Sequence, residues 1–188
     1  LIGTAFANFR SGNHIITTKI EHPAILQTCA YLETQGFEVT YLMPDENGQI
    51  TPEAVRSALR NDTLLVSIMQ VNNEIGAVND IEGIAAIVKK HPGTYFHSDI
   101  TQGVGKVDLD LSNVDMASFS AHKIHGPKGV GAIYIKKNVF PDPIITGGGQ
   151  ERNRRSGTEN VPGIVGFGQA AQDMIDHMEE DNAHTAKL

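Results

Sequence analysis

The 188-residue chain has a single cysteine, Cys29, and no tryptophan. One cysteine excludes an intramolecular disulfide framework and suits a reducing compartment. The sequence has no apolar run of about 18 residues, and it does not open on a basic segment followed by an apolar one. Neither a membrane span nor a secretory signal is therefore predicted, and a cytoplasmic location is the resulting expectation.

Positive charge is also scarce. The sequence holds 15 Lys and Arg against 22 Asp and Glu, which gives a formal net charge of -7. This balance argues against nucleic acid or an anionic membrane as the main partner, because both attract basic surfaces. With 40% hydrophobic residues, the chain is long enough to bury one sizeable core, so a single globular domain is expected.

Apolar runs of strand length alternate with amphipathic segments of helix length, which is typical of an α/β protein: a mostly parallel sheet with helices on both faces. The expected strands are 14–18, 37–42, 64–69, 94–98, 115–119 and 131–136. The expected helices open on a proline or a capping residue. They start at about Pro23 (with Gly36 as a stop), at Pro52 after Thr51, after Asn79 or Asp80, and at Val161, the last one running to about Glu180.

Both ends of the sequence look like parts of helices. Residues 1–10 begin without a methionine in an apolar stretch that is typical of a helix tail, and residues 181–188 continue a helical run. We therefore expect the chain to be a piece of a longer protein.

Reactive side chains gather just after the expected strands. Four such segments are 21–23, 70–74, 99–102 and 120–123. Ligands of open parallel sheets bind in the crevice beyond the carboxyl ends of the strands. One crevice can hold all four segments, so we expect a ligand site there.

These segments supply what a pyridine cofactor with an aldehyde, a phenolic oxygen and a phosphate needs. Lys123 has the amine for a Schiff base, and Asp99 has the acid that keeps the ring nitrogen protonated. His22 suits stacking on the ring, and Gln102 can donate to the phenolic oxygen. Each residue alone has an ordinary alternative, such as solvated surface, a helix cap, the start of a helix or a solvent-facing amide. Their convergence favours the cofactor.

Two other motifs lie near Lys123. His122 and His125 have a spacing found in metal sites, but Gly126-Pro127 argues against the helix that would place both on one face. The segment 126–131 is glycine-rich, yet it lacks the spacing of a nucleotide phosphate loop and leads into a strand. We therefore expect no metal and a tight turn.

A basic cluster follows the glycine triplet at 147–149. Arg152, Arg154 and Arg155 precede Ser156-Gly157-Thr158. The segment either binds an anion such as phosphate or carboxylate, or is a solvated basic loop. The sequence leaves both possibilities open.

Taken together, five segments resemble the cysteine desulfurases, which belong to the class V aminotransferase group of pyridoxal-phosphate enzymes. They are EHPA at 21–24, NNEIG at 72–76, HSDITQ at 97–102, SAHKIHGPKG at 120–129 and RSGTEN at 155–160. The combination spans nearly the whole chain in the right order, so it is far more specific than any one segment. It implies that residues 1–188 are the central part of the cofactor-binding large domain of fold type I. An N-terminal segment and a small C-terminal domain would lie outside the chain.

The resemblance also implies a role for each candidate residue. Lys123 would carry pyridoxal 5'-phosphate, and His22 would stack on its ring and carry protons. Asp99 would pair with the ring nitrogen, and Gln102 would pair with the phenolic oxygen. Asn73 would contact the cofactor or the substrate, and Ser120 and His122 would hold the phosphate. Thr158 would join the phosphate site from the other subunit of a homodimer.

The implied reaction converts L-cysteine to L-alanine and leaves the sulfur as a persulfide on an enzyme cysteine. Lys123 would act as the base at the α-carbon while the protonated ring stores electrons. The sulfur would then pass to an acceptor or scaffold protein for iron–sulfur cluster assembly or another thiolation pathway.

Cys29 does not match the family's nucleophilic cysteine. It falls on the apolar face of the expected first helix with Ile25 and Leu32, where a buried thiol stays protonated, so we expect it in the core. The family's phosphate-binding loop, nucleophilic cysteine and substrate-binding arginine have no counterpart here. The chain made alone is therefore expected not to turn over cysteine.

Two alternatives stay open at this point. A selenocysteine lyase or a cysteine sulfinate desulfinase would share these residues. In a different class of function, the chain would be a non-catalytic piece that dimerises or binds a partner.

Overall fold

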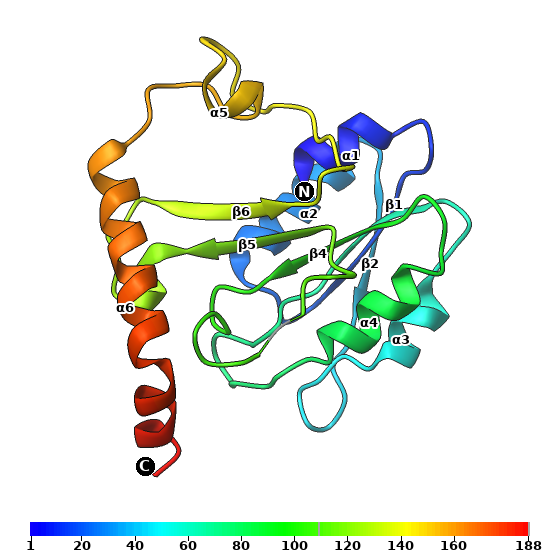
Figure 1. Cartoon of the computed structure of the whole chain (residues 1–188). Helices are drawn as coiled ribbons and strands as arrows, with labels where there is room; N and C mark the ends of the chain where they lie inside the picture. The colour runs from blue at the N-terminus through cyan, green and yellow to red at the C-terminus, as the bar shows by residue number, and fades with distance from the viewer. Residues whose placement is uncertain (109, 188) are drawn as a thin grey trace.

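The computed structural model describes residues 1–108 and 110–187. Its centre is a six-stranded sheet with the order β2-β1-β3-β4-β5-β6 (Figure 1). The strands are β1 (His14–Thr18), β2 (Glu38–Leu42), β3 (Thr63–Ser67), β4 (Tyr95–Asp99), β5 (Met116–Ser120) and β6 (Gly131–Ile135). Strands β1 to β5 are parallel and β6 is antiparallel to β5, which confirms the mostly parallel α/β fold.

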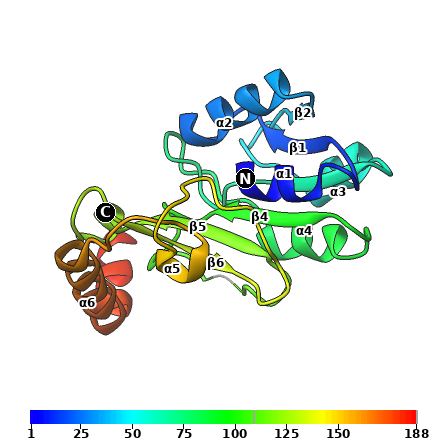
Figure 2. The same ribbon diagram turned by 90° about the horizontal axis from the view of Figure 1, so that it is seen from above.

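Helices cover both faces of the sheet, as the sequence predicts. They are α1 (Ile2–Asn8), α2 (Pro23–Thr34), α3 (Pro52–Ala58), α4 (Ile81–Val88), α5 (Gln150–Asn153) and α6 (Val161–Thr185), with a short 3-10 helix, η1 (Ala121–Ile124). Helices α1 and α2 lie on one face, and α3 and α4 lie on the other (Figure 2). Among the described residues, no helix combines the length and the apolar character that crossing a membrane requires.

Each face of the sheet has its own hydrophobic core. The neighbouring residues Ile15 and Ile16 of β1 are both fully buried, and they belong to different cores because successive side chains of a strand point to opposite faces. Ile15 packs in the core that contains Leu32 of α2, whereas Ile16 packs in the core that contains Ile84 of α4. Burial on both faces fits the apolar character of the central strands β1 and β3, which are buried along their whole length.

The predicted helix starts are confirmed at atomic detail. Thr51 caps α3 by accepting from the Ala54 N–H at 3.2 Å, and Asp80 caps α4 by accepting from the Gly83 N–H at 2.8 Å.

Other boundaries differ from the expectation. The last helix, expected from Val161 to about Glu180, runs on to Thr185, which agrees with the helical run expected at 181–188. The segments η1 and α5 were not predicted, because glycines and polar residues surround both.

Helix α6 supports the end of β5 from outside the sheet. Phe167 and Ala170 of α6 pack against Ala121 and Ile124 of η1. The rings of Phe119 and Phe167 meet edge to face, with centroids 5.6 Å apart. Figure 1 shows α6 standing across the carboxyl end of β5. The residues between Ala121 and Ile124 are thereby fixed in place.

Candidate active site

The loops that follow β1 and β3 are bonded to each other at the carboxyl edge of the sheet. Glu21 accepts a hydrogen bond at Oε1 from the Met69 N–H at 2.9 Å. The Asn72 amide Nδ2 donates to the Ile20 carbonyl at 2.6 Å. These two bonds hold the segments 21–23 and 70–74 side by side.

The same edge continues through β4 and β5. The Gln70 N–H donates to the Asp99 carbonyl at 2.9 Å, and the Ile100 N–H donates to the Ser118 carbonyl at 3.0 Å. The four segments that the sequence places after strands therefore form one continuous row.

Lys123 lies in η1, directly after β5 ends at Ser120. Because Ala121 and Ile124 are buried under α6, Lys123 and its neighbour His122 are left exposed. The Lys123 amine makes no hydrogen bond to the described residues, and its carbonyl accepts from Lys106 Nζ at 3.4 Å. The backbone at Lys123 is thus fixed, and its side-chain amine is accessible for bonding to a ligand.

Asp99 is the last residue of β4 and is half-buried. Its Oδ1 accepts from the Thr101 N–H at 3.0 Å, whereas its Oδ2 has no hydrogen-bond partner among the described residues. One oxygen therefore orients the carboxyl group and the other is available. Gln102 follows in the next turn, half-buried and with no hydrogen bond from its amide to the described residues.

His22 is the N-cap of α2, and its Nδ1 accepts from the Ala24 N–H at 3.1 Å. A neutral imidazole that accepts at Nδ1 carries its proton on Nε2. The ring is exposed and Nε2 has no bond to the described residues. His22 thus presents an Nε2–H group that can donate a hydrogen bond.

Asn73 is left free because its neighbour makes the structural contacts. Oδ1 of Asn72 accepts from the N–H groups of Glu74 and Ile75 at 2.9 and 3.0 Å, while its Nδ2 reaches across to Ile20. The half-buried Asn73 side chain makes no hydrogen bond to the described residues. Sequence reasoning missed the structural role of Asn72, although the Asn-Asn pair was a visible signal.

The candidate phosphate residues are in two places. Ser120 precedes η1 without capping it, and His122 is exposed one residue before Lys123. Thr158 is exposed in the segment between α5 and α6, and no hydrogen bond of the described residues joins it to the carboxyl edge. This chain by itself brings Ser120 and His122 to the row, but not Thr158.

His97 strengthens the sheet two residues before Asp99. Its fully buried ring bridges three strands, with Nδ1 at 2.9 Å from Ser67 Oγ and Nε2 at 3.0 Å from Ser118 Oγ. Burial lowers the pKa of His97 to about 3, so the ring is neutral and bonds one serine as donor and the other as acceptor. No role for His97 was predicted from the sequence, although its position inside an expected strand was a visible signal.

Cys29 is fully buried on α2, which confirms the expected core position. Burial raises the pKa of the thiol to about 12. Cys29 therefore stays protonated at neutral pH and is a poor nucleophile.

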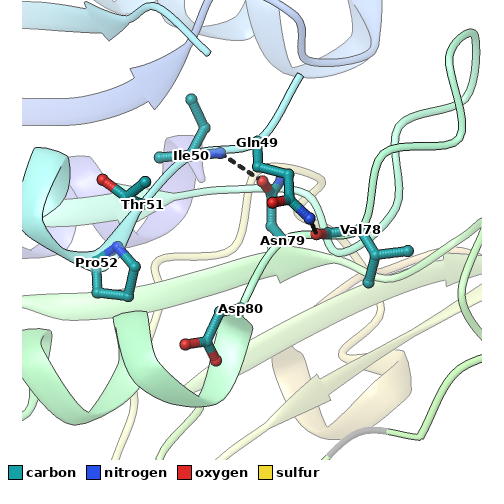
Figure 3. Close-up of a pocket in the computed structure, with 7 residues that line it drawn as sticks. All are labelled: Gln49, Ile50, Thr51, Pro52, Val78, Asn79 and Asp80. Atoms are coloured by element: carbon teal, nitrogen blue, oxygen red, sulfur yellow. Dashed lines mark hydrogen bonds between the residues drawn. The ribbon is translucent and has the colours of Figure 1, made fainter. Parts of the chain in front are cut away.

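An open hollow of about 320 Å³ lies away from these residues (Figure 3). Its polar groups are already paired: Asn79 Oδ1 accepts from the Ile50 N–H, and Gln49 Nε2 donates to the Val78 carbonyl, both at 2.7 Å. None of the candidate residues lines it. We therefore assign a structural role to the residues that line this hollow: their hydrogen bonds join the segments that lead into α3 and α4.

Comparison with known proteins assigns the chain to a family. The model of the family "Aminotransferase class-V" matches residues 1–188. This chain belongs to the class V aminotransferases. It is 52% identical over 188 residues to the "Cysteine desulfurase IscS" of Methanosarcina thermophila, with 99% of this chain and 46% of the relative covered. A protein of the same name from Pseudomonas aeruginosa is 50% identical over 190 residues, with 99% and 47% covered.

Solved structures agree with this assignment. A "NifS-like protein" superposes with a TM-score of 0.91 and 46% identity over 95% of this chain and 50% of that one. A structure named "SspA in complex with cysteine" has a TM-score of 0.86 and 43% identity over 91% and 50%. The class V fold is thus confirmed, and the chain spans about half the length of the relatives it matches.

The class V family uses pyridoxal phosphate, and the row of residues fits that cofactor. It offers an amine, a carboxylate oxygen, an imidazole N–H, two amides and a hydroxyl that make no hydrogen bond to the described residues. Polar side chains fixed by the backbone but left unpaired are a feature of ligand sites. The donor and acceptor set matches an aldehyde, a pyridine nitrogen, a phenolic oxygen and a phosphate.

Proposed function

We propose that the protein to which this chain contributes is a pyridoxal-phosphate-dependent cysteine desulfurase. The observation that carries the proposal is that the amine of Lys123 and Oδ2 of Asp99 lie in the same row and make no hydrogen bond to the described residues. The whole protein would convert L-cysteine to L-alanine and leave the sulfur as a persulfide on an enzyme thiol. Names of relatives that are about 50% identical support this activity.

Bound pyridoxal phosphate would supply the electron sink for the substrate's α-carbon. In this proposal Lys123 attaches the cofactor and moves a proton at the α-carbon, and Asp99 holds a proton at the ring nitrogen through Oδ2. His22 would cover the ring and would exchange protons through Nε2, the nitrogen that has no hydrogen bond to the described residues. The remaining contacts are Gln102 with the phenolic oxygen, Asn73 with cofactor or substrate, and Ser120 and His122 with the phosphate.

The thiol that accepts sulfur is not Cys29 in this proposal. A nucleophilic cysteine needs exposure and thiolate character, and Cys29 has neither. As Cys29 is the only cysteine of the chain, the accepting thiol and the substrate-binding arginine would come from other parts of the protein. Residues 1–188 would form the central part of the large domain.

We also propose that the protein works as a homodimer in the cytoplasm. Thr158 is exposed and is not joined to the carboxyl edge by a hydrogen bond of the described residues, which suits a contact with the site of a second subunit. The persulfide sulfur would then pass to an acceptor or scaffold protein, for iron–sulfur cluster assembly or thiolation.

The test uses the full-length protein and the variant Lys123→Ala. We expect the wild type to form alanine from L-cysteine and to show the visible absorbance of bound pyridoxal phosphate. Lys123→Ala should lose both, whereas Lys137→Ala, which removes an exposed lysine without a hydrogen bond to the described residues, should keep both. Retention of the band and of alanine formation in Lys123→Ala would contradict the proposal.

A further inference from the structure

Glu21 is a buried carboxyl group to which the proposed reaction gives no role. It lies between the end of β1 and His22, and only 4% of its surface is exposed. Its Oε1 accepts two hydrogen bonds, from the Met69 N–H at 2.9 Å and from the Thr18 hydroxyl at 3.1 Å. Its Oε2 is buried and has no hydrogen-bond partner among the described residues.

This uneven bonding suits a protonated carboxyl group. A buried carboxylate needs donors at both oxygens, and leaving one charged oxygen without a donor is unfavourable. A neutral carboxylic acid keeps Oε1 as the acceptor for both donors and carries its hydrogen on Oε2, where an unpaired neutral hydroxyl costs less than an unpaired charged oxygen.

The surroundings of Glu21 favour the same form. Burial, with a smaller contribution from the negative charge of Asp99, raises the pKa of Glu21 to about 8, although the bonds from Met69 and Thr18 oppose the rise. Cys29 of α2 also interacts with Glu21, and it stays a neutral thiol. Glu21 is more deeply buried than Asp99, and burial disfavours the charged form of a carboxyl group.

The bonds of Glu21 also determine where His22 lies. Together with the Asn72–Ile20 bond, they tie residues 20–21 to the segment that follows β3. His22 comes next in the chain and starts α2. A charged Glu21 would in addition place a second negative charge near Asp99.

We propose that Glu21 is a positioning residue that acts as a neutral acid: it fixes the segment carrying His22 against the end of β3 and keeps a second negative charge away from Asp99. Its effect on catalysis rests on the proposed function, whereas its protonation does not.

The first experiment tests the protonation through the stability of the full-length protein. The raised pKa means that the folded state keeps a proton that the unfolded chain releases, so stability falls as pH rises from about 4.5 to about 8. Glu21→Gln, which imitates the neutral acid, removes this dependence. We expect its Tm relative to wild type to rise by at least about 2 °C between pH 5 and pH 8.

The control is Glu46→Gln, which changes an exposed glutamate without a hydrogen bond from its side chain to the described residues and should show no such trend. A Tm difference for Glu21→Gln that stays constant, or falls as pH rises, would overturn the proposal. This experiment needs no turnover, so its result stands even if the protein does not desulfurate cysteine.

The second experiment tests the positioning at pH 7 by alanine formation from L-cysteine. Glu21→Gln should keep kcat/KM within about 3-fold of wild type, because it keeps the length and the neutral form. Glu21→Asp is one methylene too short to reach both Thr18 and Met69, and it should lower kcat by about 10-fold or more with little change in KM.

Other combinations of activity in these two variants would contradict the proposed role of Glu21. If Glu21→Asp is active and Glu21→Gln is not, the negative charge is required and the proposal fails. If the two variants behave alike, Glu21 does not position His22 in the neutral form. If wild type itself forms no alanine, the proposed function fails, and the stability experiment alone decides the protonation.

Discussion

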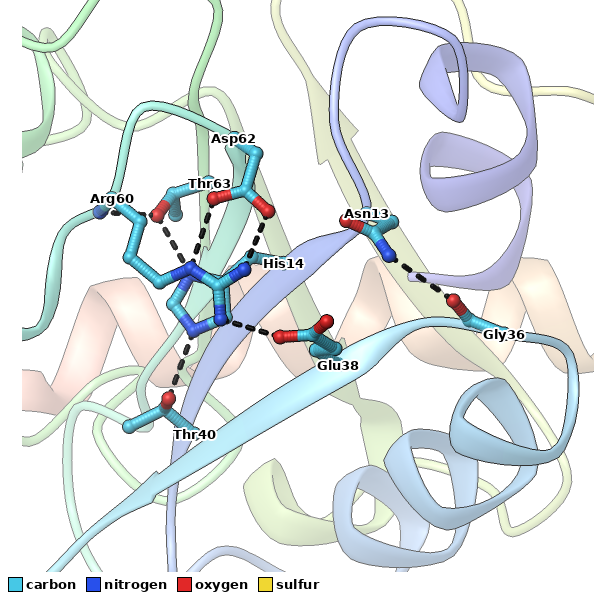
Figure 4. A network of polar contacts seen from close by, with 8 residues as sticks. All are labelled: Asn13, His14, Gly36, Glu38, Thr40, Arg60, Asp62 and Thr63. Carbon is cyan, nitrogen blue, oxygen red and sulfur yellow. Dashed lines mark hydrogen bonds and ion pairs between the residues drawn. The ribbon is translucent and has the colours of Figure 1, made fainter.

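The two ends of the sheet differ in how their polar side chains are hydrogen-bonded. At the amino end they bond one another: the ring of His14 lies 2.7 Å from Thr63 Oγ1 and 2.8 Å from Thr40 Oγ1 (Figure 4). Arg60 forms ion pairs there with Asp62 and Glu38. At the carboxyl end, side chains stay unpaired with the described residues; these are Asn73, Gln102, Ser120, His122 and Lys123.

This difference separates stability from function. Paired polar groups hold the strands together and need nothing from outside. Unpaired groups on a rigid backbone add little to stability, and their partners come with a ligand. Substitutions of the paired residues at the amino end should therefore change the free energy of unfolding, and substitutions of the unpaired residues at the carboxyl end should change turnover.

The largest effect is expected for Asp99→Asn in the full-length protein. The amide cannot hold the ring nitrogen's proton, so kcat/KM for L-cysteine should fall by roughly 100-fold or more. The Tm should change little, since Asn Oδ1 can still accept from the Thr101 N–H. Asp142→Asn, at an exposed aspartate, is the control. A kcat/KM within about 3-fold of wild type would remove Asp99 from the proposed mechanism.

His14→Ala should give the opposite outcome. It empties a fully buried position and leaves Thr63 and Thr40 without their partner, so we expect a loss of about 2–4 kcal/mol in the free energy of unfolding. The kcat/KM of the folded protein should be unchanged. Urea denaturation measures the loss, with exposed His184→Ala as the control. Impaired turnover at unaltered stability would break the distinction between the two ends.

A smaller effect comes from His97, which lies close to the carboxyl end but is fully paired. Burial lowers the pKa of His97 to about 3. Below pH 6.5 this histidine therefore binds a proton in the unfolded chain but not in the folded state, so the free energy of unfolding decreases as pH falls toward 3. Between pH 6.5 and 5.5 this loss is about 1 kcal/mol or less. The variant His97→Gln should have a lower free energy of unfolding than wild type, and this free energy should depend less on pH between 6.5 and 5.5 than that of wild type. An unchanged pH dependence would contradict a neutral buried His97.

The smallest effect is expected for Arg60→Ala. Its ion pairs with Asp62 and Glu38 are substantially exposed, with 43% of the Arg60 side-chain surface accessible. Exposed ion pairs contribute little to stability, and salt screens them. Thermal unfolding at low and high salt should show a small difference that disappears at high salt. A loss as large as that of His14→Ala would show that the surface pairs, and not the buried ring, hold the amino end together.

Local chemistry made much of the fold predictable. Thr51 before Pro52 marks a helix start by itself, because a cap and its helix are neighbours in sequence. The apolar runs predicted the buried parallel strands because each run is a local feature of the sequence. The row at the carboxyl edge was also predictable, since parallel strands end on the same side.

Long-range contacts were not predictable from one sequence. The bond between Glu21 and Met69 joins residues 48 positions apart, and nothing near Glu21 in the sequence indicates it. The bridge from His97 to Ser67 and Ser118 depends on strand order in the same way. Thr158 stays a prediction, because its proposed partner atoms belong to a second subunit.

The most direct test of the account is to find which lysine binds pyridoxal phosphate. The full-length protein would be incubated with the cofactor and reduced with borohydride, which makes the bond between lysine and the cofactor aldehyde permanent, and its peptides would be mapped by mass. We predict that the pyridoxyl mass is found on Lys123. A protein that carries the label on Lys106 or Lys128 instead, or that takes up no label, would contradict the central role of the carboxyl end of the sheet.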